Sequence, residues 1–254
     1  SGLHGGVTTM ISAGEVHLPG RPRDPAGVKA EAILVSKSFR NARPAGVKVH
    51  AGAVILEPEL TESDFEEMAR HGVWLVGEIG LGGVHRPEDA APMVAWARKH
   101  GMKTMMHCGG QSMPQGTTTT LEDILRVRPD VVSHLNGGPT AMALEEVEAL
   151  VRDTDFVFDL VTIGNPKARV KAIEWAERYG ALSRVMIGSD CPGGFGWPPY
   201  AILRTVVDVA ALNGISPEVA LAMATGNTAL GYGLAGVGTI APAKEADLVI
   251  MDAP

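Results

Sequence analysis

The feature that most constrains the fold is a regular alternation of short apolar runs with longer amphipathic stretches. Each apolar run is followed by a segment with helical periodicity, and the runs begin near residues 7, 46, 73, 103, 131, 156 and 184. Repeated strand–helix units form parallel sheets, because each helix carries the chain back to the end where the next strand begins. The sequence therefore predicts an α/β protein with seven parallel strands.

Local signals at the ends of two helical stretches support this pattern. The stretch 61–72 opens with Thr61 and Asp64, an acidic form of the capping box, and closes with Gly72, which suits a left-handed cap. The stretch 87–101 has proline at its start, basic residues in its last turn and Gly101 at its end. Both stretches are therefore predicted to be helices.

Two architectures contain alternating strands and helices, namely a (β/α)8 TIM barrel and a doubly wound open sheet. No GxGxxG turn follows an early strand, and polar residues stand at the ends of many strands, which favours the barrel. Because the chain begins in what resembles the end of a helix, we expect a barrel that lacks its first strand. We assign residues 1–235 to this barrel and 236–254 to the start of a return strand, "ADLVIMD", of a small β-sandwich domain that is mostly missing.

Charge and composition restrict the partners. The formal net charge is −7 and no basic run is present, which disfavours a nucleic-acid partner, since binding to phosphates releases counterions only through basic side chains. The sequence has no stretch of about 18 uninterrupted apolar residues, so no membrane span is predicted. The two cysteines, Cys108 and Cys191, are too few for a disulfide framework and suggest a reducing, cytoplasmic compartment. We also expect a homo-oligomer.

Four ionisable residues stand at the carboxyl ends of four different predicted strands. Glu78 follows "VWLVG", His107 follows "KTMM", His134 follows "VVS" and Asp190 follows "VMIGS". In a barrel these ends surround one mouth, so the four side chains are expected to converge. Imidazole and carboxylate groups together suit zinc, iron or manganese. The set therefore predicts a metal centre.

Other interpretations hold for each residue taken alone. A lone histidine near a strand end is usually a hydrogen-bonded core residue, and Glu78 is equally suited to pair with a buried cation. Asp190 alone fits the N-cap of the next helix. His50 is either a core residue or a substrate contact at the mouth, and Asn136 is a weak candidate for substrate binding.

The same residues resemble the amidohydrolase superfamily. The order of Glu78, His107, His134 and Asp190 along the chain is similar to the metal constellation of that superfamily on its fourth, fifth, sixth and eighth strands. The segment "MATGNTALGYGLAGVGTIAPAKEADLVIMD" resembles its passage from barrel to β-sandwich, and "GGVTTMIS" resembles the strand after its His-x-His motif. The His-x-His pair itself is absent from the chain, which we therefore expect to be a fragment lacking two ligands.

This resemblance implies a metal-dependent cyclic amide hydrolase of nicotinate degradation. The reaction would open the enamide C–N bond of a tetrahydro-oxonicotinate by attack of metal-bound hydroxide, giving formylglutarate and ammonia. The centre would hold two divalent ions, zinc with iron. Glu78 would bridge them, His107 and His134 would bind one, and Asp190 would bind the other and carry the proton as base and then acid.

Three alternatives to that activity stay open at this point. One is another ring hydrolase or a deaminase, dihydroorotase-like or imidazolonepropionase-like. The second is an inactive remnant or a binding module without a metal. The third is a barrel that holds phosphate on the glycine turns after these strands.

Overall fold

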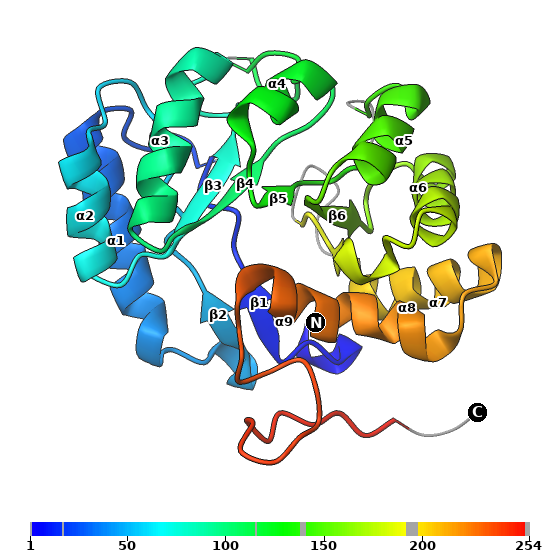
Figure 1. The fold of residues 1–254 in the computed structure, drawn as a ribbon. Coiled ribbons are helices and arrows are strands. Elements are labelled where there is room, and N and C mark those ends of the chain that lie inside the picture. Colours follow the sequence, from blue (N-terminus) through cyan, green and yellow to red (C-terminus); the bar gives the residue numbers. More distant parts are fainter. Residues whose placement is uncertain (1, 17, 115, 138–140, 192–197, 252–254) are drawn as a thin grey trace.

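The structure is a computed structural model that describes residues 2–16, 18–114, 116–137, 141–191 and 198–251 (Figure 1). Its strands are β1 Thr9–Ile11, β2 Lys48–His50, β3 Leu75–Ile79, β4 Lys103–Met106, β5 Val131–Val132, β6 Val157–Val161 and β7 Val185–Gly188. Its helices are α1 Pro25–Asn41, α2 Glu62–Arg70, α3 Pro87–Lys99, α4 Leu121–Val127, α5 Leu144–Asp153, α6 Pro166–Arg178, α7 Ala201–Asn213, α8 Pro217–Ala224 and α9 Gly226–Tyr232. Short 3-10 turns lie at Leu3–Gly5, Pro44–Gly46 and Leu182–Arg184.

All strand pairs within the described residues are parallel, and neighbours in space are neighbours in sequence. One sheet has the order β1-β2 and the other has the order β3-β4-β5-β6-β7. A parallel bridge between Val54 and Val76 joins the chain beyond β2 to β3. A doubly wound sheet would reverse its strand order at a switch point, whereas a barrel keeps sequential order. The predicted barrel-type architecture is therefore confirmed.

The helix boundaries follow the sequence signals. Thr61 and Asp64 form the predicted capping box of α2, and Gly72 after its end has a φ of 89°. Helix α3 begins at Pro87, and Gly101 beyond its end has a φ of 76°. Both predicted helices are therefore confirmed. Glycine suits the positions after their ends, because it adopts left-handed conformations more readily than other residues.

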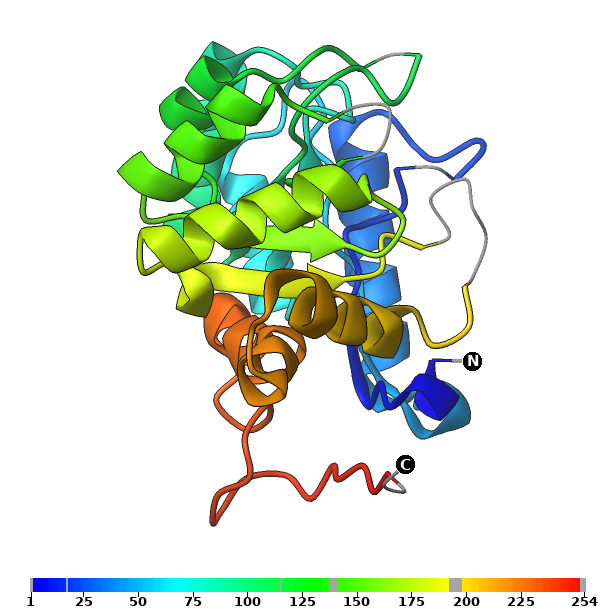
Figure 2. The same ribbon diagram turned by 90° about the vertical axis from the view of Figure 1, so that its right-hand side faces the viewer.

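The helices surround the strands on the outside (Figures 1 and 2). Outward-facing strand residues such as Val76, Met106 and Phe158 pack with the inner faces of these helices in the main hydrophobic core. A second cluster contains the strand residues Leu75, Met105, Val131 and Met186 together with Tyr232 of α9. Because alternate residues of a strand face opposite sides, this cluster marks the inner face of the curved sheet.

The C-terminal segment differs from its prediction. Residues 246–251 form no strand, and Ile250 is 96% exposed. No described strand pairs with this segment, and an extended chain without a ladder partner has nothing to satisfy its backbone groups except water. The expected strand "ADLVIMD" is therefore not formed in the described part, and the β-sandwich assignment stays a prediction.

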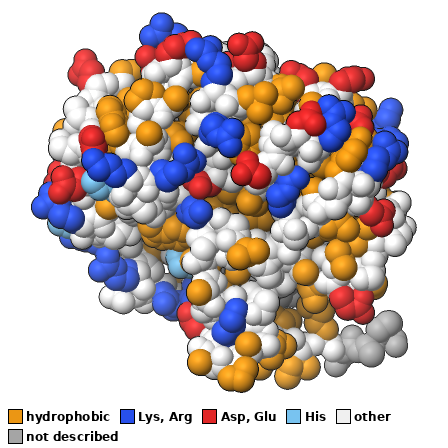
Figure 3. All heavy atoms as spheres, in the orientation of Figure 1, with side chains coloured by type: hydrophobic (Ala, Val, Ile, Leu, Met, Phe, Trp, Pro, Cys, Tyr) orange, Lys and Arg blue, Asp and Glu red, His pale blue; other side chains and the backbone are white. Residues whose placement is uncertain are grey.

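Two surface properties bear on the expected partners. Acidic and basic side chains are interspersed over the face of the molecule in Figure 3. Among the described residues, no helix has the length and apolar character needed to cross a membrane.

Candidate metal centre

The candidate site lies one layer above the inner apolar cluster, towards the carboxyl ends of the strands. Met105, Val131 and Val157 are register partners on β4, β5 and β6. The residues two positions further along each strand face the same way, because side chains alternate along a strand. This places His107, Ser133 and Asp159 at one level on the inner face.

Glu78 reaches this level through an irregularity in β3. The register between β3 and β4 shifts between Val76 and Ile79, so Glu78 falls in a bulge. The bulge passes close to the chain after β1, since a Cβ atom on Gly77 would lie 2.2 Å from the Ala13 carbonyl oxygen. Bulges re-aim side chains beside active sites. The absence of a side chain at position 77 is therefore part of how Glu78 is positioned.

The Glu78 carboxylate and the two imidazoles form a compact group. His134 Nε2 lies 3.1 Å from Glu78 Oε1 and 3.0 Å from His107 Nδ1. His107 Nε2 lies 2.8 Å from the Gly110 carbonyl oxygen, which can only accept, so Nε2 carries the proton and neutral His107 presents its Nδ1 lone pair to the group. All three side chains are buried. The backbone of His134 is strained, with a φ of 34°.

The pKa values of the two histidines are shifted in opposite directions. Burial, followed by the neighbouring His134, lowers the pKa of His107 to about 4. Burial also acts to lower the pKa of His134, but the Glu78 carboxylate outweighs it and the pKa of His134 is raised well above its ordinary value. At neutral pH His107 is therefore a neutral ligand, whereas His134 holds a proton that a bound cation would displace.

These residues fit a divalent transition metal. One ligand atom from each of Glu78, His107 and His134 lies within 4.8 Å of the others. One carboxylate and two imidazoles are a donor set that zinc or iron accepts, with room for further ligands. Three of the four predicted ligands are thus brought together.

Asp190 lies outside this compact group. It lies two residues beyond the end of β7, is exposed, and has a φ of 54°. Its charge raises the pKa of Asp159, so it lies near the site. The next described helix, α7, has Tyr200 at its N-cap position, so Asp190 does not cap that helix. Its role as a metal ligand stays a prediction.

Asp159 is a site residue that the sequence analysis missed. It lies on β6 at the level of His107 and Ser133, in register with Met186 of the inner face. Burial, then the charges of Asp190 and Glu78, raise its pKa to about 7, although His134 acts in the opposite direction. A detectable signal was present, because an aspartate within the apolar run "FVFDLV" is as costly to bury unpaired as Glu78.

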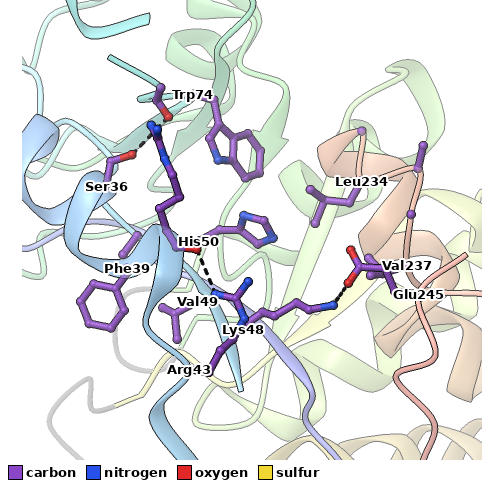
Figure 4. Close-up of a pocket in the computed structure, with 16 residues that line it drawn as sticks. Ser36, Phe39, Arg43, Lys48, Val49, His50, Trp74, Leu234, Val237 and Glu245 are labelled. Carbon is purple, nitrogen blue, oxygen red and sulfur yellow. Dashed lines mark hydrogen bonds and ion pairs between the residues drawn. The ribbon is translucent and has the colours of Figure 1, made fainter. Parts of the chain in front are cut away.

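His50 lies in a different part of the barrel. It lines a cavity of about 410 Å³ with Lys48, Arg43 and Trp74, and no member of the metal group lines that cavity (Figure 4). The His50 ring packs against Trp74, with ring centroids 5.2 Å apart, and Trp74 lies four residues before Glu78. At about 3.3 Å per residue, Trp74 is roughly 13 Å from Glu78 along the strand. The structure therefore does not bring His50 to the mouth.

Asn136 has a structural position. It is fully buried, and its side-chain oxygen accepts from the Val161 N–H at 2.7 Å. Its amide nitrogen donates to the carbonyl oxygens of Val161 at 3.0 Å and Asn165 at 3.5 Å. Both amide protons are thus used in joining the turn after β5 to the end of β6. Contact between Asn136 and a substrate stays a prediction that this bonding does not favour.

Comparison with known proteins defines the class to which this fold and site belong. The sequence matches the amidohydrolase family over residues 3–254, and the chain belongs to that family. It is 58% identical over 254 residues to enamidase from Eubacterium barkeri, spanning the whole of this chain and 66% of that protein. The chain thus spans just under two thirds of the length of this curated relative.

Solved structures agree with this assignment. A crystal structure of enamidase superposes with a TM-score of 0.93 at 56% identity, covering 96% of this chain and 63% of that one. A putative 2-pyrone-4,6-dicarboxylic acid hydrolase from Pseudomonas putida has a TM-score of 0.54 at 15% identity, covering 84% and 78% of the two chains. The second likeness shows a shared fold only.

Proposed function

We propose that the complete protein containing these residues is a metal-dependent hydrolase of a cyclic amide. The observation that carries the proposal is the buried group of Glu78, His107 and His134 in a chain 58% identical to enamidase along its whole length. The proposed substrate is the tetrahydro-oxonicotinate ring. Hydrolysis of its amide C–N bond would open the ring to an enamine, and a second water would then hydrolyse the remaining C–N bond to give formylglutarate and ammonia.

The proposed metal ligands follow from the geometry and the family. Glu78, with two carboxylate oxygens, would bridge two ions, and His107 and His134 would bind one of them. Asp190 would bind the other. We propose zinc with iron for this pair, since imidazole and carboxylate suit both. A bound ion of this kind lowers the pKa of water to about 7 and polarises a carbonyl oxygen.

The chain's own residues then orient the reactants. The Gly110 carbonyl fixes the His107 ring through its Nε2 proton, which keeps Nδ1 directed at the group. Asp190, exposed at the end of β7, would accept a proton from the attacking water on a carboxylate oxygen. It would then return the proton to the departing ring nitrogen, because an amide nitrogen leaves poorly until it is protonated.

The setting of the enzyme is part of the proposal. Cys108 and Cys191 are both free thiols, which suits a reducing compartment such as the cytoplasm. Its partner would be a small molecule and a second copy of itself, with no nucleic acid or membrane involved. The formal net charge of −7 supports the exclusion of nucleic acid.

The test is a metal analysis and a hydrolysis assay on the complete protein. We expect about two transition-metal ions per chain and ring opening of the lactam, with little activity on a dihydroorotate or an imidazolone. Asp190→Asn should retain the ion bound by His107 and His134, weaken the binding of the other ion and lose most turnover, while the exposed control Asp155→Asn keeps normal turnover. Absence of stoichiometric metal would contradict the proposal, and unchanged turnover in Asp190→Asn would contradict the proton-transfer role.

A further inference from the structure

The cavity in Figure 4, here called the amino-end cavity, lies on the opposite side of the inner apolar cluster from the metal group. Trp74 and Leu234 line this cavity and pack against that cluster, which contains Leu75 and Met105. Met105 of β4 precedes His107 by two residues, so the cluster separates the cavity from the candidate metal centre. The cavity volume of about 410 Å³ is within the range of sites for small molecules. It is therefore a separate candidate site.

Basic side chains from the end of α1 and from β2 line the amino-end cavity. Arg40 belongs to the last turn of α1, and Arg43 follows that helix. Lys48 and His50 stand two residues apart on β2 and face the same way. Glu245 is the one acidic residue among the described residues that line the cavity. The local balance is therefore the reverse of that of the whole chain, whose formal net charge is −7.

Two carboxylates of the C-terminal segment pair with Lys48 at the edge of the cavity. The Glu245 carboxylate contacts Lys48 Nζ, and Asp247 Oδ2 lies 2.6 Å from the same nitrogen. Arg40 and Arg43, in contrast, donate only to main-chain carbonyl oxygens within the part of the chain that the structure describes. The charges of the two guanidinium groups are therefore not offset by a carboxylate among these residues.

The arginines use only part of their hydrogen-bonding capacity in holding the end of α1. Arg40 Nη2 donates to the His71 carbonyl oxygen at 3.0 Å. Arg43 Nη1 donates to the carbonyl oxygens of Arg40 at 3.1 Å and of Ala42 at 2.9 Å. A guanidinium group has five N–H donors, so the Nε and Nη2 atoms of Arg43 remain for a ligand. These two atoms form one edge of the guanidinium fork, which fits the two oxygens of a carboxylate.

Uncharged groups form the walls beside these cations. The His50 ring packs edge-on against Trp74, and Leu234 faces them from the loop after α9 (Figure 4). Burial, followed by the charges of Arg43 and Lys48, lowers the pKa of His50, so its ring is neutral at neutral pH. The same shift shows that the positive charges act inside the cavity. An apolar wall beside an unmatched guanidinium group suits an anion that has an apolar body.

We propose that the amino-end cavity binds a small organic carboxylate, with its carboxylate on the Nε and Nη2 edge of Arg43 and its apolar body between Trp74 and Leu234. This inference goes beyond the proposed function and does not depend on it, because the metal group takes no part in the binding. The ligand is held without covalent change. Its negative charge would lie close to His50 and would offset the charges of Arg43 and Lys48.

The probe is benzoate, and its affinity for the complete metal-loaded protein is measured by isothermal titration calorimetry. We expect Arg43→Gln to weaken binding by roughly 10- to 100-fold, the effect of hydrogen bonds to a charged group. Arg70→Gln is the matched control, because it removes the same charge from an exposed position at the end of α2 that does not line the cavity. It should leave the affinity unchanged. Because carboxylates also bind metal ions, His107→Ala is titrated as well and should bind benzoate normally.

A second measurement locates the probe inside the cavity. The pKa of His50, followed by NMR, should rise when benzoate is added, since a nearby anion favours the protonated ring. Benzamide has the same ring without the charge, and inorganic phosphate has the charge without the ring, so both should bind much more weakly than benzoate. Binding that persists in Arg43→Gln but is lost in His107→Ala would place benzoate on the metal and overturn the inference. A His50 pKa that benzoate does not change, or phosphate that binds as tightly as benzoate, would overturn it too.

Discussion

The two ends of the barrel strands hold histidines in opposite surroundings. At the carboxyl ends, His107 and His134 lie beside the Glu78 carboxylate, which raises the pKa of His134. Towards the amino ends, His50 packs edge-on against Trp74, with ring centroids 5.2 Å apart. Burial, followed by the charges of Arg43 and Lys48, lowers the pKa of His50. One setting attracts a cation and the other repels it.

This difference indicates that surroundings, and not residue type, distinguish the candidate metal centre. The amino-end cavity contains a histidine, an acidic residue and several basic residues. Its acidic residue, Glu245, is already paired with Lys48, as is Asp247. The mouth has the reverse balance, with three carboxylates around two imidazoles. A divalent ion lowers the energy of the second arrangement and raises that of the first.

The largest expected effect comes from removing one imidazole at each end. His107→Ala should lower metal affinity by more than about 100-fold, because even partners behind a ligand contribute 10- to 100-fold. His50→Ala should leave metal affinity unchanged. Titration of the two purified variants with zinc, followed by metal analysis after dialysis, checks the pair. Loss of metal from His50→Ala would mean that the two ends are not separate sites.

A second prediction concerns the carboxylate balance in the metal-free protein. The folded pKa of Asp159 is about 7, above its ordinary 3.8, so folding favours the protonated form. Its contribution to stability is fully present below pH 4 and is lost as pH rises through 7. Asp159→Asn removes this loss. The stability of the variant relative to the unsubstituted protein should therefore increase between pH 4 and pH 7.

The size of this effect follows from the difference between the folded pKa of Asp159, about 7, and its ordinary value of 3.8. At about 1.4 kcal/mol per unit the ceiling is roughly 4 kcal/mol, and partial exposure to water reduces it to about 2 kcal/mol. Urea unfolding at several pH values in the presence of a chelator measures it. Asp155→Asn, an exposed change two residues before the strand that contains Asp159, is the matched control. A constant difference for Asp159→Asn would show that Asp159 has an ordinary pKa.

The sequence predicted the architecture more fully than it predicted the site. The periodicity alone also fits a doubly wound sheet, and the sequential strand order followed from the missing GxGxxG turn and the polar residues at many strand ends. Glu78, His107 and His134 were predicted from their places at strand ends. Asp159 was not, since it lies inside an apolar run, and its direction depends on which face of β6 is the inner one.

The positions of His50 and Glu78 depend on contacts that a local sequence pattern does not reveal. His50 stands at the end of a short strand like the metal ligands, yet the bridge between Val54 and Val76 shows that the ladder continues beyond it. The bulge that directs Glu78 inward depends on contact between Gly77 and the chain after β1, which is a tertiary contact. Contacts between segments that are far apart in the sequence cannot be inferred from the spacing of residues.

A third prediction tests that bulge. Gly77→Ala would place a methyl group 2.2 Å from the Ala13 carbonyl oxygen, which belongs to the backbone and cannot rotate away. We expect a loss of about 1 to 3 kcal/mol in the free energy of unfolding, with weakened metal affinity as Glu78 shifts. Gly116→Ala is the control, because its nearest contacts would be 3.4 Å. Unfolding by urea and zinc titration give the two quantities, and full metal affinity in Gly77→Ala would show that the bulge does not position Glu78.

The smallest expected effect lies at the amino end. Lys48→Ala removes ion pairs with Glu245 and Asp247, of which Glu245 is about half exposed. Pairs in contact with water contribute at most about 1 kcal/mol and weaken as salt is added, since counterions screen them. The variant should therefore be less stable by up to about 1 kcal/mol at low salt, with a smaller difference in 0.5 M salt and no change in metal content.

Because removing Lys48 also takes a positive charge away from His50, the pKa of His50 followed by NMR should rise towards its ordinary value. An unchanged pKa would mean that burial and Arg43, rather than Lys48, lower the pKa of His50 relative to the histidines of the mouth.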